Sequence, residues 1–426
     1  MTTISTYTVT SSRDDKYPFV YANPVRVEQR YHPEHDDSSP AQPTPQATAT
    51  QSALLLHGVG QQYTLVTDHA IPSILGQEEI LVKVQAIGLN PIDWKGPAYN
   101  FGIPSLPWIN GRDLAGVVVA VRDANSRIRV GDRVLVPSTD YRDIRKAAFQ
   151  QYAVATHFNA ARIPAATGLH VSASLGVAFV AATLALGVSL GLDYTTIAAC
   201  PGPNLVEVVQ KVPPTEIPAD VREECFAAVP EHERLRKGDW LVIWGASTTT
   251  GMITLQLAKL AGVKVICVAD VARHGARLHA LGADVLVDRH APARAVEIIR
   301  GVTQGKLRFA VDIVGRDTAA LLQEVLVEDG TVREDGSHAH LLGLTGLPKE
   351  RRPGIVYHTV PIKLFHASAG VGETMVAWLE ELLQSTALVC PEVVRHAGGL
   401  EGINAALDTL RQGGVSGKRI VIELEG

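Results

Sequence analysis

The sequence predicts an α/β protein with a β-rich domain and a doubly wound parallel sheet that helices cover on both faces. Length is the first reason, because 426 residues exceed the roughly 250–300 residues that one hydrophobic core serves. The second reason is a series of short strand-like runs between residues 53 and 138, broken by Gly, Pro and Asn. The third is the alternation of strands and helices after Gly238, which is typical of a parallel sheet.

The N-terminal part does not resemble a folded domain. Residues 1–52 are predicted to be an extension and a disordered linker, because residues 32–52 are polar and have no apolar period. The β-rich region then begins with strand-like runs at short intervals, which predict a small barrel. These runs are residues 53–58, 78–89, 114–121 and 132–138.

Residues 164–192 contain no Asp, Glu, Lys or Arg, and such a stretch is long enough to cross a bilayer. However, this stretch is rich in Ala, Gly and Ser, and basic residues do not flank one end as they do in membrane spans. We therefore predict a buried helix between the domains, with helical structure starting near Val177. Residues 193–237 contain Pro-Gly-Pro and Pro-Pro and are predicted to be a loop insertion that is too polar and broken for core.

The parallel sheet is predicted from the spacing of apolar residues, which changes repeatedly between the pattern of a strand and the 3.6-residue period of a helix. Apolar residues recur at helical spacing in 252–261, and a second helix is expected at 275–281. The predicted strands are residues 240–244, 264–268, 285–288, 309–314 and 339–344, with a closing strand at 418–424.

The composition excludes several classes of protein. With 46% apolar residues, 19% charged residues and a net charge of −5, the chain has no electrostatic footprint for nucleic acid or an anionic membrane. Its four cysteines are more than twenty residues apart, which excludes CxxC pairs and a disulfide scaffold and indicates a reducing, cytoplasmic compartment. The first residues, MTTISTY, have no basic start and no apolar stretch, so we expect no signal peptide.

A glycine loop lies between the strand at 240–244 and the helix that follows. Gly245 and Gly251 enclose Ser247, Thr248, Thr249 and Thr250, and a helix N-terminus with hydroxyls beside it suits a pyrophosphate. Only the outer two glycines of a dinucleotide fingerprint are present, so a tight turn with capping hydroxyls explains the loop equally well.

Asp270 and Arg273 follow the second strand of this unit. An acidic residue about twenty positions after such a loop commonly binds the ribose 2′-hydroxyl, whereas an arginine there can hold a 2′-phosphate. The two residues therefore favour opposite cofactors, and a solvated strand end explains both without any ligand.

Several motifs occur in the order found in medium-chain dehydrogenases and reductases. They are Asn90-Pro-Ile-Asp93-Trp-Lys95, Gly111-Arg-Asp-Leu-Ala-Gly116, Val130-Gly-Asp-Arg-Val134, the glycine loop and Ser416-Gly-Lys418. From about residue 53 to the C-terminus the chain resembles the zinc-free quinone-oxidoreductase branch, and most of all the fungal trans-acting enoyl reductases that partner polyketide synthases.

This resemblance implies a Rossmann domain, 179–367, inserted in a GroES-like catalytic domain made of 53–178 and 368–426. It also implies NADPH as the cofactor, with Leu344 and Lys418 joining the glycine loop in binding it. Zinc-dependent relatives carry Cys where this chain has Asn90 and His where it has Arg112. Because catalytic zinc needs three converging ligands, the resemblance predicts no metal site.

The function that the resemblance implies is reduction of an α,β-unsaturated polyketide thioester on a carrier domain of a synthase, which a monomer would suit. Without a Lewis acid, the developing enolate needs hydrogen-bond donors. We predict Lys95 as a donor in the cleft, with Asn90 and Asp93 lining it, although Lys95 could be a surface lysine and Asp93 could cap a turn.

Two further classes of function remain open on sequence alone. One is a free-standing quinone or enone reductase, and the other is an isomerase, a cyclase or a binding partner on the same fold. His32, His35, His338 and His340 lie in polar surroundings in the sequence and are predicted to be solvated.

Overall fold

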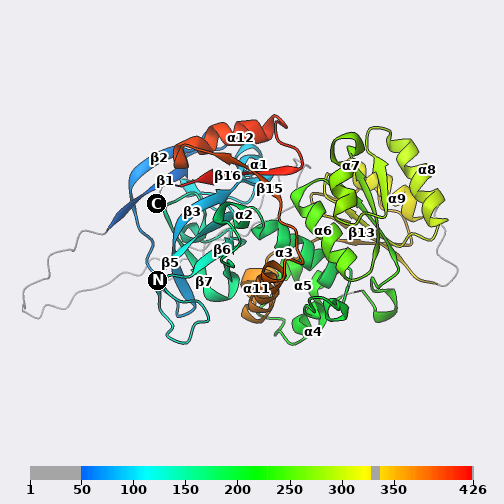
Figure 1. Ribbon diagram of the computed structural model, residues 1–426, viewed down its shortest axis with the longest axis horizontal. Coiled ribbons are helices and arrows are strands. Elements are labelled where there is room, and N and C mark those ends of the chain that lie inside the picture. The colour runs from blue at the N-terminus through cyan, green and yellow to red at the C-terminus, as the bar shows by residue number, and fades with distance from the viewer. Residues whose placement is uncertain (1–48, 228, 328–335, 425–426) are drawn as a thin grey trace, which may run out of the picture. The chain divides into compact units, whose positions relative to one another are not determined.

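A computed structural model describes residues 49–227, 229–327 and 336–424 (Figure 1). Most of the predicted N-terminal extension and linker, with His32 and His35, lies outside these residues. The linker prediction is wrong for Thr50, Gln51 and Ser52, because β1 starts at Thr50. Gln51 and Ala53 are buried, so their packing overrides the polar character of the preceding sequence.

The β-rich domain contains two sheets. The larger one has the order β15-β16-β3-β5-β6-β8, with β7 paired to β3, and the smaller one has the order β2-β1-β4. The strands of the larger sheet are β3 (Glu79–Gly88), β5 (Asp113–Val121), β6 (Arg133–Pro137), β7 (Tyr152–Thr156), β8 (Ala161–Arg162), β15 (Glu392–His396) and β16 (Lys418–Glu423). Those of the smaller sheet are β1 (Thr50–Leu56), β2 (Thr64–Ala70) and β4 (Trp108–Ile109).

The end of the chain returns to the first domain. β16 pairs antiparallel with β3, with Val421 opposite Gly88, and β15 pairs parallel with β16. Helix α12 (Ile403–Arg411) packs against α1 (Pro91–Tyr99). The last part of the sequence thus completes the sheet that the first part began.

The second domain is a six-stranded, wholly parallel sheet in the order β11-β10-β9-β12-β13-β14. Its strands are β9 (Trp240–Trp244), β10 (Lys264–Ala269), β11 (Val285–Asp288), β12 (Phe309–Asp312), β13 (Ala339–Gly343) and β14 (Ile355–His358). The connecting helices are α6 (Thr249–Leu260), α7 (Val271–Ala280), α8 (Pro292–Thr303) and α9 (Arg316–Leu326). The strand order reverses at β9, and ligands in such sheets bind at the carboxyl ends beside that point.

Two expectations for this domain need correction. The short strand β14 was not predicted, because four residues after a proline-containing polar run carry too little periodic signal. His340 was predicted to be solvated, but it is fully buried in β13. Its Nδ1 lies 3.0 Å from His358 Nε2, and its ring stacks on Phe309. His338, in contrast, is half-exposed and pairs with Glu233.

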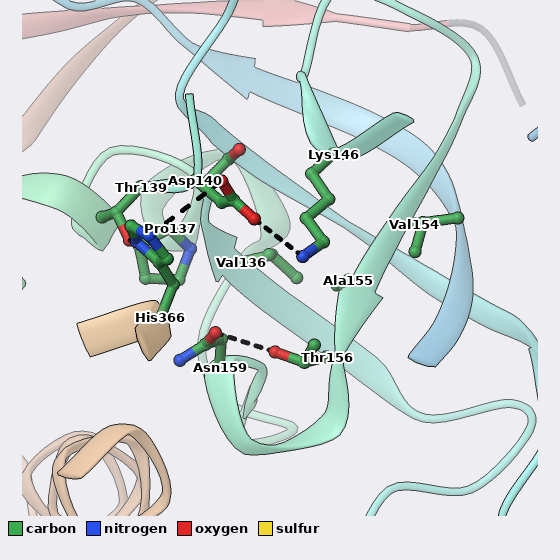
Figure 2. Close-up of a pocket in the computed structure, with 11 residues that line it drawn as sticks. Val136, Pro137, Thr139, Asp140, Lys146, Val154, Ala155, Thr156, Asn159 and His366 are labelled. Carbon is green, nitrogen blue, oxygen red and sulfur yellow. Dashed lines mark hydrogen bonds and ion pairs between the residues drawn. The ribbon is translucent and has the colours of Figure 1, made fainter. Parts of the chain in front are cut away.

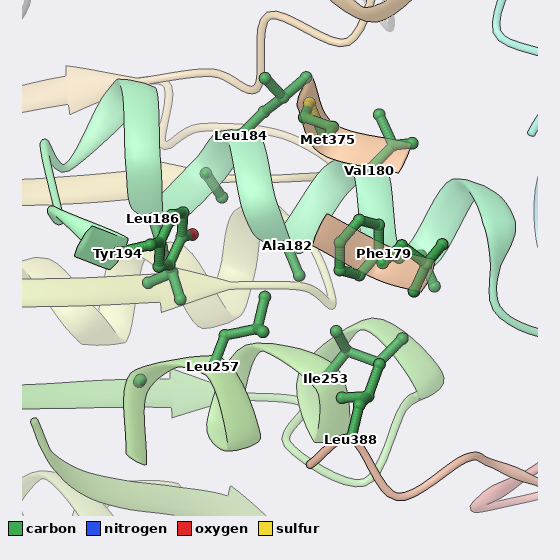
Figure 3. Packing of buried hydrophobic residues seen from close by; sticks show 14 of the residues in the cluster. Phe179, Val180, Ala182, Leu184, Leu186, Tyr194, Ile253, Leu257, Met375 and Leu388 are labelled. Carbon is green, nitrogen blue, oxygen red and sulfur yellow. The ribbon is translucent and has the colours of Figure 1, made fainter. Parts of the chain in front are cut away.

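The charge-free stretch forms helices α2 (Leu169–Ser172) and α3 (Gly176–Leu184), which continues into a π-helical turn, η3 (Ala185–Ser189). This span is long and apolar enough to cross a membrane, but 89% of its apolar window is buried inside the protein. Phe179 and Ala182 of α3 face Ile253 and Leu257 of α6 (Figure 3). The prediction of a buried core helix is confirmed.

Residues 193–227 and 229–237 do not form the loop outside the core that the sequence suggested. They contain helices α4 (Leu205–Gln210) and α5 (Ala219–Phe226). Tyr194 is fully buried, donates a hydrogen bond to the Thr183 carbonyl at 2.9 Å and stacks near Trp378. Prolines hid this contribution, because they interrupt the apolar period without preventing burial of the side chains between them.

Candidate active site

The glycine loop connects β9 to α6 and has the geometry of an anion cradle. Gly245 has φ +89°, a left-handed conformation that favours glycine. A Cβ on Gly251 would lie 2.5 Å from the Gly245 carbonyl oxygen and 2.7 Å from the Ala246 Cα. Both glycines are therefore needed for the close approach of the helix to the turn.

The helix start supplies hydrogen-bond donors toward this cradle. Thr248 is the N-cap residue of α6, and its Oγ1 accepts from the Gly251 N–H at 3.0 Å. The N–H groups of Thr249 and Thr250 lie in the first turn of α6, where an N–H group has no carbonyl acceptor within the helix. With the positive end of the helix dipole, these groups fit a pyrophosphate. Ser247 is half-buried at the same turn.

Asp270 directly follows β10 and is the N-cap residue of α7. Its Oδ1 accepts from the Arg273 N–H at 3.1 Å, and its Oδ2 lies 3.5 Å from His290 Nε2. Desolvation acts to raise the pKa of Asp270, but the Arg273 N–H and His290 together lower it below the ordinary value. The carboxylate thus has partners at this strand end, and the exposed Arg289 adds a positive charge near it.

The other two predicted cofactor residues lie in different domains. Leu344 follows β13, and its N–H donates to the Asp312 carbonyl at 2.8 Å, at the carboxyl end of the parallel sheet. Lys418 starts β16, is half-exposed and pairs with Glu392 at 3.1 Å. Its neighbour Ser416 lies 2.8 Å from His274 of α7, so the structure brings this segment against the parallel-sheet domain.

A buried polar network surrounds Asn90 at one edge of the larger β-sheet. The register places Gly88 of β3 opposite Asp113 of β5, and Asp113 opposite Pro137 of β6. Asn90 is the N-cap residue of α1, and Arg419 reaches the same edge from β16. Four segments of the chain therefore converge at this point.

Both the nitrogen and the oxygen of the Asn90 side-chain amide form hydrogen bonds in this network. Its Nδ2 donates to Asp113 Oδ2 at 3.0 Å, and its Oδ1 accepts from Arg419. Arg419 Nη2 also pairs with Asp113 Oδ2 at 2.7 Å, and Asp113 Oδ1 accepts from the Val177 N–H at 2.6 Å. Burial raises the pKa of Asp113, and the charge of Arg419 opposes this rise. Asn90 is thus held in place rather than left with a free donor.

Asp93 lies in the same network. Its Oδ2 accepts from the Asn90 N–H at 2.7 Å, which gives α1 a capping box. Its Oδ1 is buried and has no hydrogen-bond partner in the described part of the chain. Burial raises the pKa of Asp93 to about 7, against the opposing effects of the Asn90 N–H and Arg112. Arg112, also buried, stacks on Tyr141 with its Cζ 3.9 Å from the ring centroid.

The structure does not bring Lys95 into this network. Lys95 Nζ lies 5.7 Å from the centroid of the Trp94 ring, and Arg411 of α12 approaches the same ring at 5.9 Å. Lys95 therefore lies on the side of α1 that carries Trp94, whereas Asn90 and Asp93 lie at the buried start of the helix.

Sequence reasoning missed a small cavity next to this network. Its volume is about 20 Å³, which is room for a single water molecule. The polar side chains that line it include those of Thr139, Asp140, Lys146 and His366 (Figure 2). His366 comes from α10 (Leu364–Ala367) and the others from residues 139–146. No motif joins positions 227 residues apart, so only the fold could reveal this cluster.

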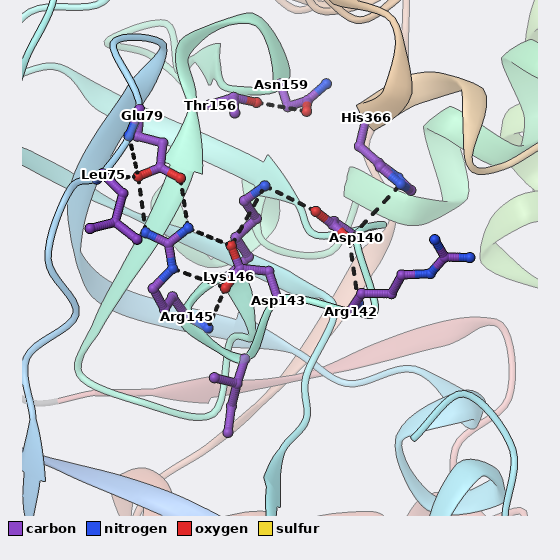
Figure 4. A network of polar contacts seen from close by, with 12 residues as sticks. Leu75, Glu79, Asp140, Arg142, Asp143, Arg145, Lys146, Thr156, Asn159 and His366 are labelled. Carbon is purple, nitrogen blue, oxygen red and sulfur yellow. Dashed lines mark hydrogen bonds and ion pairs between the residues drawn. The ribbon is translucent and has the colours of Figure 1, made fainter. Parts of the chain in front are cut away.

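A chain of ion pairs runs from the cavity to the start of β3. Lys146 Nζ pairs with Asp140 at 3.0 Å and lies 3.8 Å from Asp143. Asp143 in turn pairs with Arg145, which also holds Glu79 at the start of β3 (Figure 4). Burial acts to raise the pKa of Glu79, but Arg145 and two backbone N–H groups lower it to about 2. Ion pairs of Asp140 with Lys146 and of Arg145 with Glu79 thus hold residues 140–146, which follow β6, in place.

Among the described residues, no group of three or more His, Cys, Asp or Glu could hold a metal ion. At the Asn90 position the donor set is one amide, one carboxylate and the Arg419 guanidinium, and this permanent positive charge would repel a metal cation.

Two family models match the chain. Residues 76–170 match the alcohol dehydrogenase GroES-like domain, and residues 249–341 match the zinc-binding dehydrogenase family. Among curated relatives, the trans-enoyl reductase BOA5 of Botryotinia fuckeliana is 28% identical over 82% of this chain and 93% of its own length. The trans-enoyl reductase eqxC of Fusarium heterosporum is 27% identical over 84% of this chain and 95% of its own.

Solved structures share the fold at low identity. Escherichia coli quinone oxidoreductase complexed with NADPH aligns with a TM-score of 0.64 at 18% identity, over 88% of this chain and 100% of that one. The CurK enoyl reductase aligns with a TM-score of 0.64 at 16% identity, over 88% and 99%. These findings confirm the predicted fold, a parallel Rossmann sheet together with a GroES-like domain. The two matched regions are the two domains of the medium-chain dehydrogenase/reductase fold, and this is the fold that the chain adopts.

Proposed function

We propose that the protein is an NADPH-dependent enoyl reductase that acts in trans on an α,β-unsaturated polyketide thioester carried by a synthase. The observation that carries this proposal is similarity to trans-enoyl reductases over more than four fifths of the chain. The glycine loop supports it, because its turn and the first turn of α6 suit a dinucleotide phosphate.

The reaction requires the protein to position two carbons and to stabilise a developing enolate. A bound nicotinamide supplies the hydride. The glycine loop supplies the proposed phosphate site, and the hydrogen-bonded side chains of Asn90, Asp113 and Arg419 form a rigid part of the proposed cleft. Lys95 stays the predicted donor to the enolate oxygen; in this structure its ammonium group lies 5.7 Å from the Trp94 ring centroid.

The surroundings of Asp270 favour NADPH over NADH. Its carboxylate caps α7 by accepting from the Arg273 N–H and lies 3.5 Å from His290 Nε2. Arg273, Arg289 and His290 are exposed beside it, and guanidinium groups pair well with a 2′-phosphate. We propose that these cations outweigh Asp270 as the cofactor selector.

The zinc-free character of the site is also part of the proposal. Arg419 donates to both Asn90 and Asp113 and takes the place that a metal cation would need. Reduction of an activated alkene tolerates this arrangement, because the negative charge spreads onto a carbonyl that neutral or cationic donors can stabilise.

The test is cofactor titration followed by turnover of a crotonyl-type thioester, measured at the nicotinamide absorbance. We expect NADPH to bind at least about tenfold more tightly than NADH. Arg273→Ala should weaken NADPH binding by about 1 kcal/mol, as expected for loss of an exposed ion pair, and should leave NADH binding unchanged. Reduction of quinones but of no thioester would support the free-standing quinone reductase. Binding without any turnover would support a non-redox role. Preference for NADH would mean that Asp270 binds the ribose.

A further inference from the structure

A buried carboxyl group, that of Asp312, lies beside the glycine loop. Asp312 is the last residue of β12 and is completely buried. In the parallel sheet it is paired with Trp244, the last residue of β9, which directly precedes Gly245. A Cβ on Gly245 would lie 2.9 Å from Val314 Cγ2, so the segment after Asp312 packs against the loop. The carboxyl therefore lies at the end of the sheet where the cofactor phosphates are proposed to bind.

The two oxygens of the Asp312 carboxyl have different surroundings. Oδ1 accepts from the Val314 N–H at 3.0 Å and from the Gly315 N–H at 2.7 Å, just before α9. Oδ2 is buried and has no hydrogen-bond partner among the described residues. A carboxylate oxygen can only accept hydrogen bonds, and a buried acceptor without a donor costs free energy. A proton on Oδ2 would remove the negative charge that makes this position unfavourable.

The Asp312 carboxyl has no charged partner in the part of the chain that the structure describes. Burial raises its pKa to about 6, and only hydrogen bonds from residues 314–318 oppose this rise. Arg316 and Asp317 belong to the same segment, but neither affects this pKa. The turns after the flanking strands β9 and β13 include no charged side chain. A charge that a ligand brings to this end of the sheet should therefore act on Asp312 without compensation.

We propose, on the basis of the cofactor role proposed above, that Asp312 takes up a proton from solvent when the dinucleotide binds, so that the protein binds NADPH more tightly as the pH falls. A carboxylate beside a bound pyrophosphate would face a second negative charge, which favours the protonated form. The proton returns to solvent when the cofactor leaves. Because proton uptake is an equilibrium property, it depends on the two end states and not on the path of the proton.

Linkage fixes the sign and the size of the effect. With a pKa of about 6 in the free protein, Asp312 is mostly ionised at pH 7. A rise of this pKa by about one unit on binding adds about 0.4 proton per bound cofactor at pH 7. It also makes the dissociation constant up to about tenfold smaller at about pH 5 than at about pH 8.

Calorimetric titration with NADPH at pH 7 in two buffers of different ionisation enthalpy measures the protons taken up. Asp312→Asn cannot ionise but keeps an acceptor for the Val314 and Gly315 N–H groups, so we expect it to fold. Asp239→Asn is the matched control, because Asp239 precedes β9 at the opposite end of the same sheet. Uptake should fall by about 0.4 proton per cofactor in Asp312→Asn and stay unchanged in Asp239→Asn. The difference between variants is decisive, since His290 and the 2′-phosphate also titrate.

A second measurement needs no variant and tests the proposal even if Asp312→Asn does not fold. Difference infrared spectra of the wild type with and without NADPH should show the carbonyl band of a protonated carboxyl, which shifts in D₂O. Absence of this band at pH 7 would overturn the proton uptake.

The outcomes also separate this proposal from the proposed function. Equal proton uptake by the wild type and a folded Asp312→Asn variant would overturn the linkage and leave the reductase intact. Uptake that depends on Asp312, in a protein that reduces no thioester, would support the linkage and overturn the reductase. Failure of the wild type to bind NADPH or NADH would overturn both.

Discussion

The glycine loop and the Asn90 network differ in how far apart their residues lie in the sequence. The loop takes its glycines, cap and donors from residues 245–251, between one strand and the next helix. The network joins Asn90, Asp113 and Arg419 across more than three hundred positions. A local site can be identified from spacing alone, whereas a site assembled from distant segments depends on the register of a sheet.

The two regions should also respond differently to substitution. Changes in the loop should affect cofactor affinity, because its glycines and its cap shape the start of α6. Changes in the network should affect the stability of the fold, because buried charges have no alternative partners.

The largest expected effect is that of Arg419→Met. This substitution leaves the Asp113 carboxylate buried without its cation, and breaking a buried pair in this way typically costs about 3–5 kcal/mol of unfolding free energy. Arg395→Met is the matched control, because Arg395 is exposed on the neighbouring strand β15. Denaturant unfolding of both variants gives the comparison. Equal midpoints would mean that the network does not stabilise the domain.

Gly251→Val should weaken NADPH binding by about a hundredfold, the equivalent of losing one or two charge-assisted hydrogen bonds of about 1.5–3 kcal/mol each. The new side chain would collide with the backbone of Gly245 and Ala246 and open the cradle. Gly301→Val is the control, since a Cβ at this exposed helical position meets nothing within 4 Å. Unchanged NADPH affinity in a folded Gly251→Val variant would assign the loop to a structural turn only.

Lys95→Met tests whether a residue outside the buried network still takes part in the reaction. If its ammonium group stabilises the enolate, kcat should fall at least about tenfold while NADPH affinity and fold survive. A lysine that only attracts an acidic carrier protein would raise KM and lose its effect at high salt. Kinetics on a small and a carrier-bound thioester at two ionic strengths separate these roles. Wild-type kcat on both would exclude Lys95 from the site.

The buried Asp93 carboxyl should change how the stability of the protein depends on pH. The pKa of Asp93 is raised to about 7 in the folded protein, so between about pH 4 and pH 7 the folded state binds a proton that the unfolded state has lost. This group's contribution to stability is full below pH 4 and declines as the pH rises to 7. Asp93→Asn removes that contribution, which amounts to at most one proton or about 1.4 kcal/mol per pH unit.

The stability of Asp93→Asn relative to the wild type should therefore increase from pH 4 to pH 7 and change little above that. Asp68→Asn, at an exposed position of β2, provides the control. A difference between variant and wild type that is constant with pH would show that Asp93 is ionised throughout this range.

Most strands and the glycine loop could be predicted because their signals are local. Val and Ile runs bounded by Gly and Pro indicated β3, β5 and β9, and the loop of residues 245–251 indicated the start of α6. Residues 193–237 were misjudged because Tyr194 and Leu205 are buried by α3 and α11 (Ala369–Gln384) rather than by a periodic face of their own. The same limit applies to His340, whose ring is packed by Phe309, His358 and Glu233 from separate parts of the chain.

The sequence by itself determined the fold class and the position of the glycine loop between β9 and α6, because both follow from the period and spacing of neighbouring residues. Only the tertiary structure decided that the Asn90 amide is fully used by Asp113 and Arg419, and that Thr139 meets His366. These contacts arise where strands and helices from distant parts of the chain meet, and local residue patterns carry no information about which of them become neighbours.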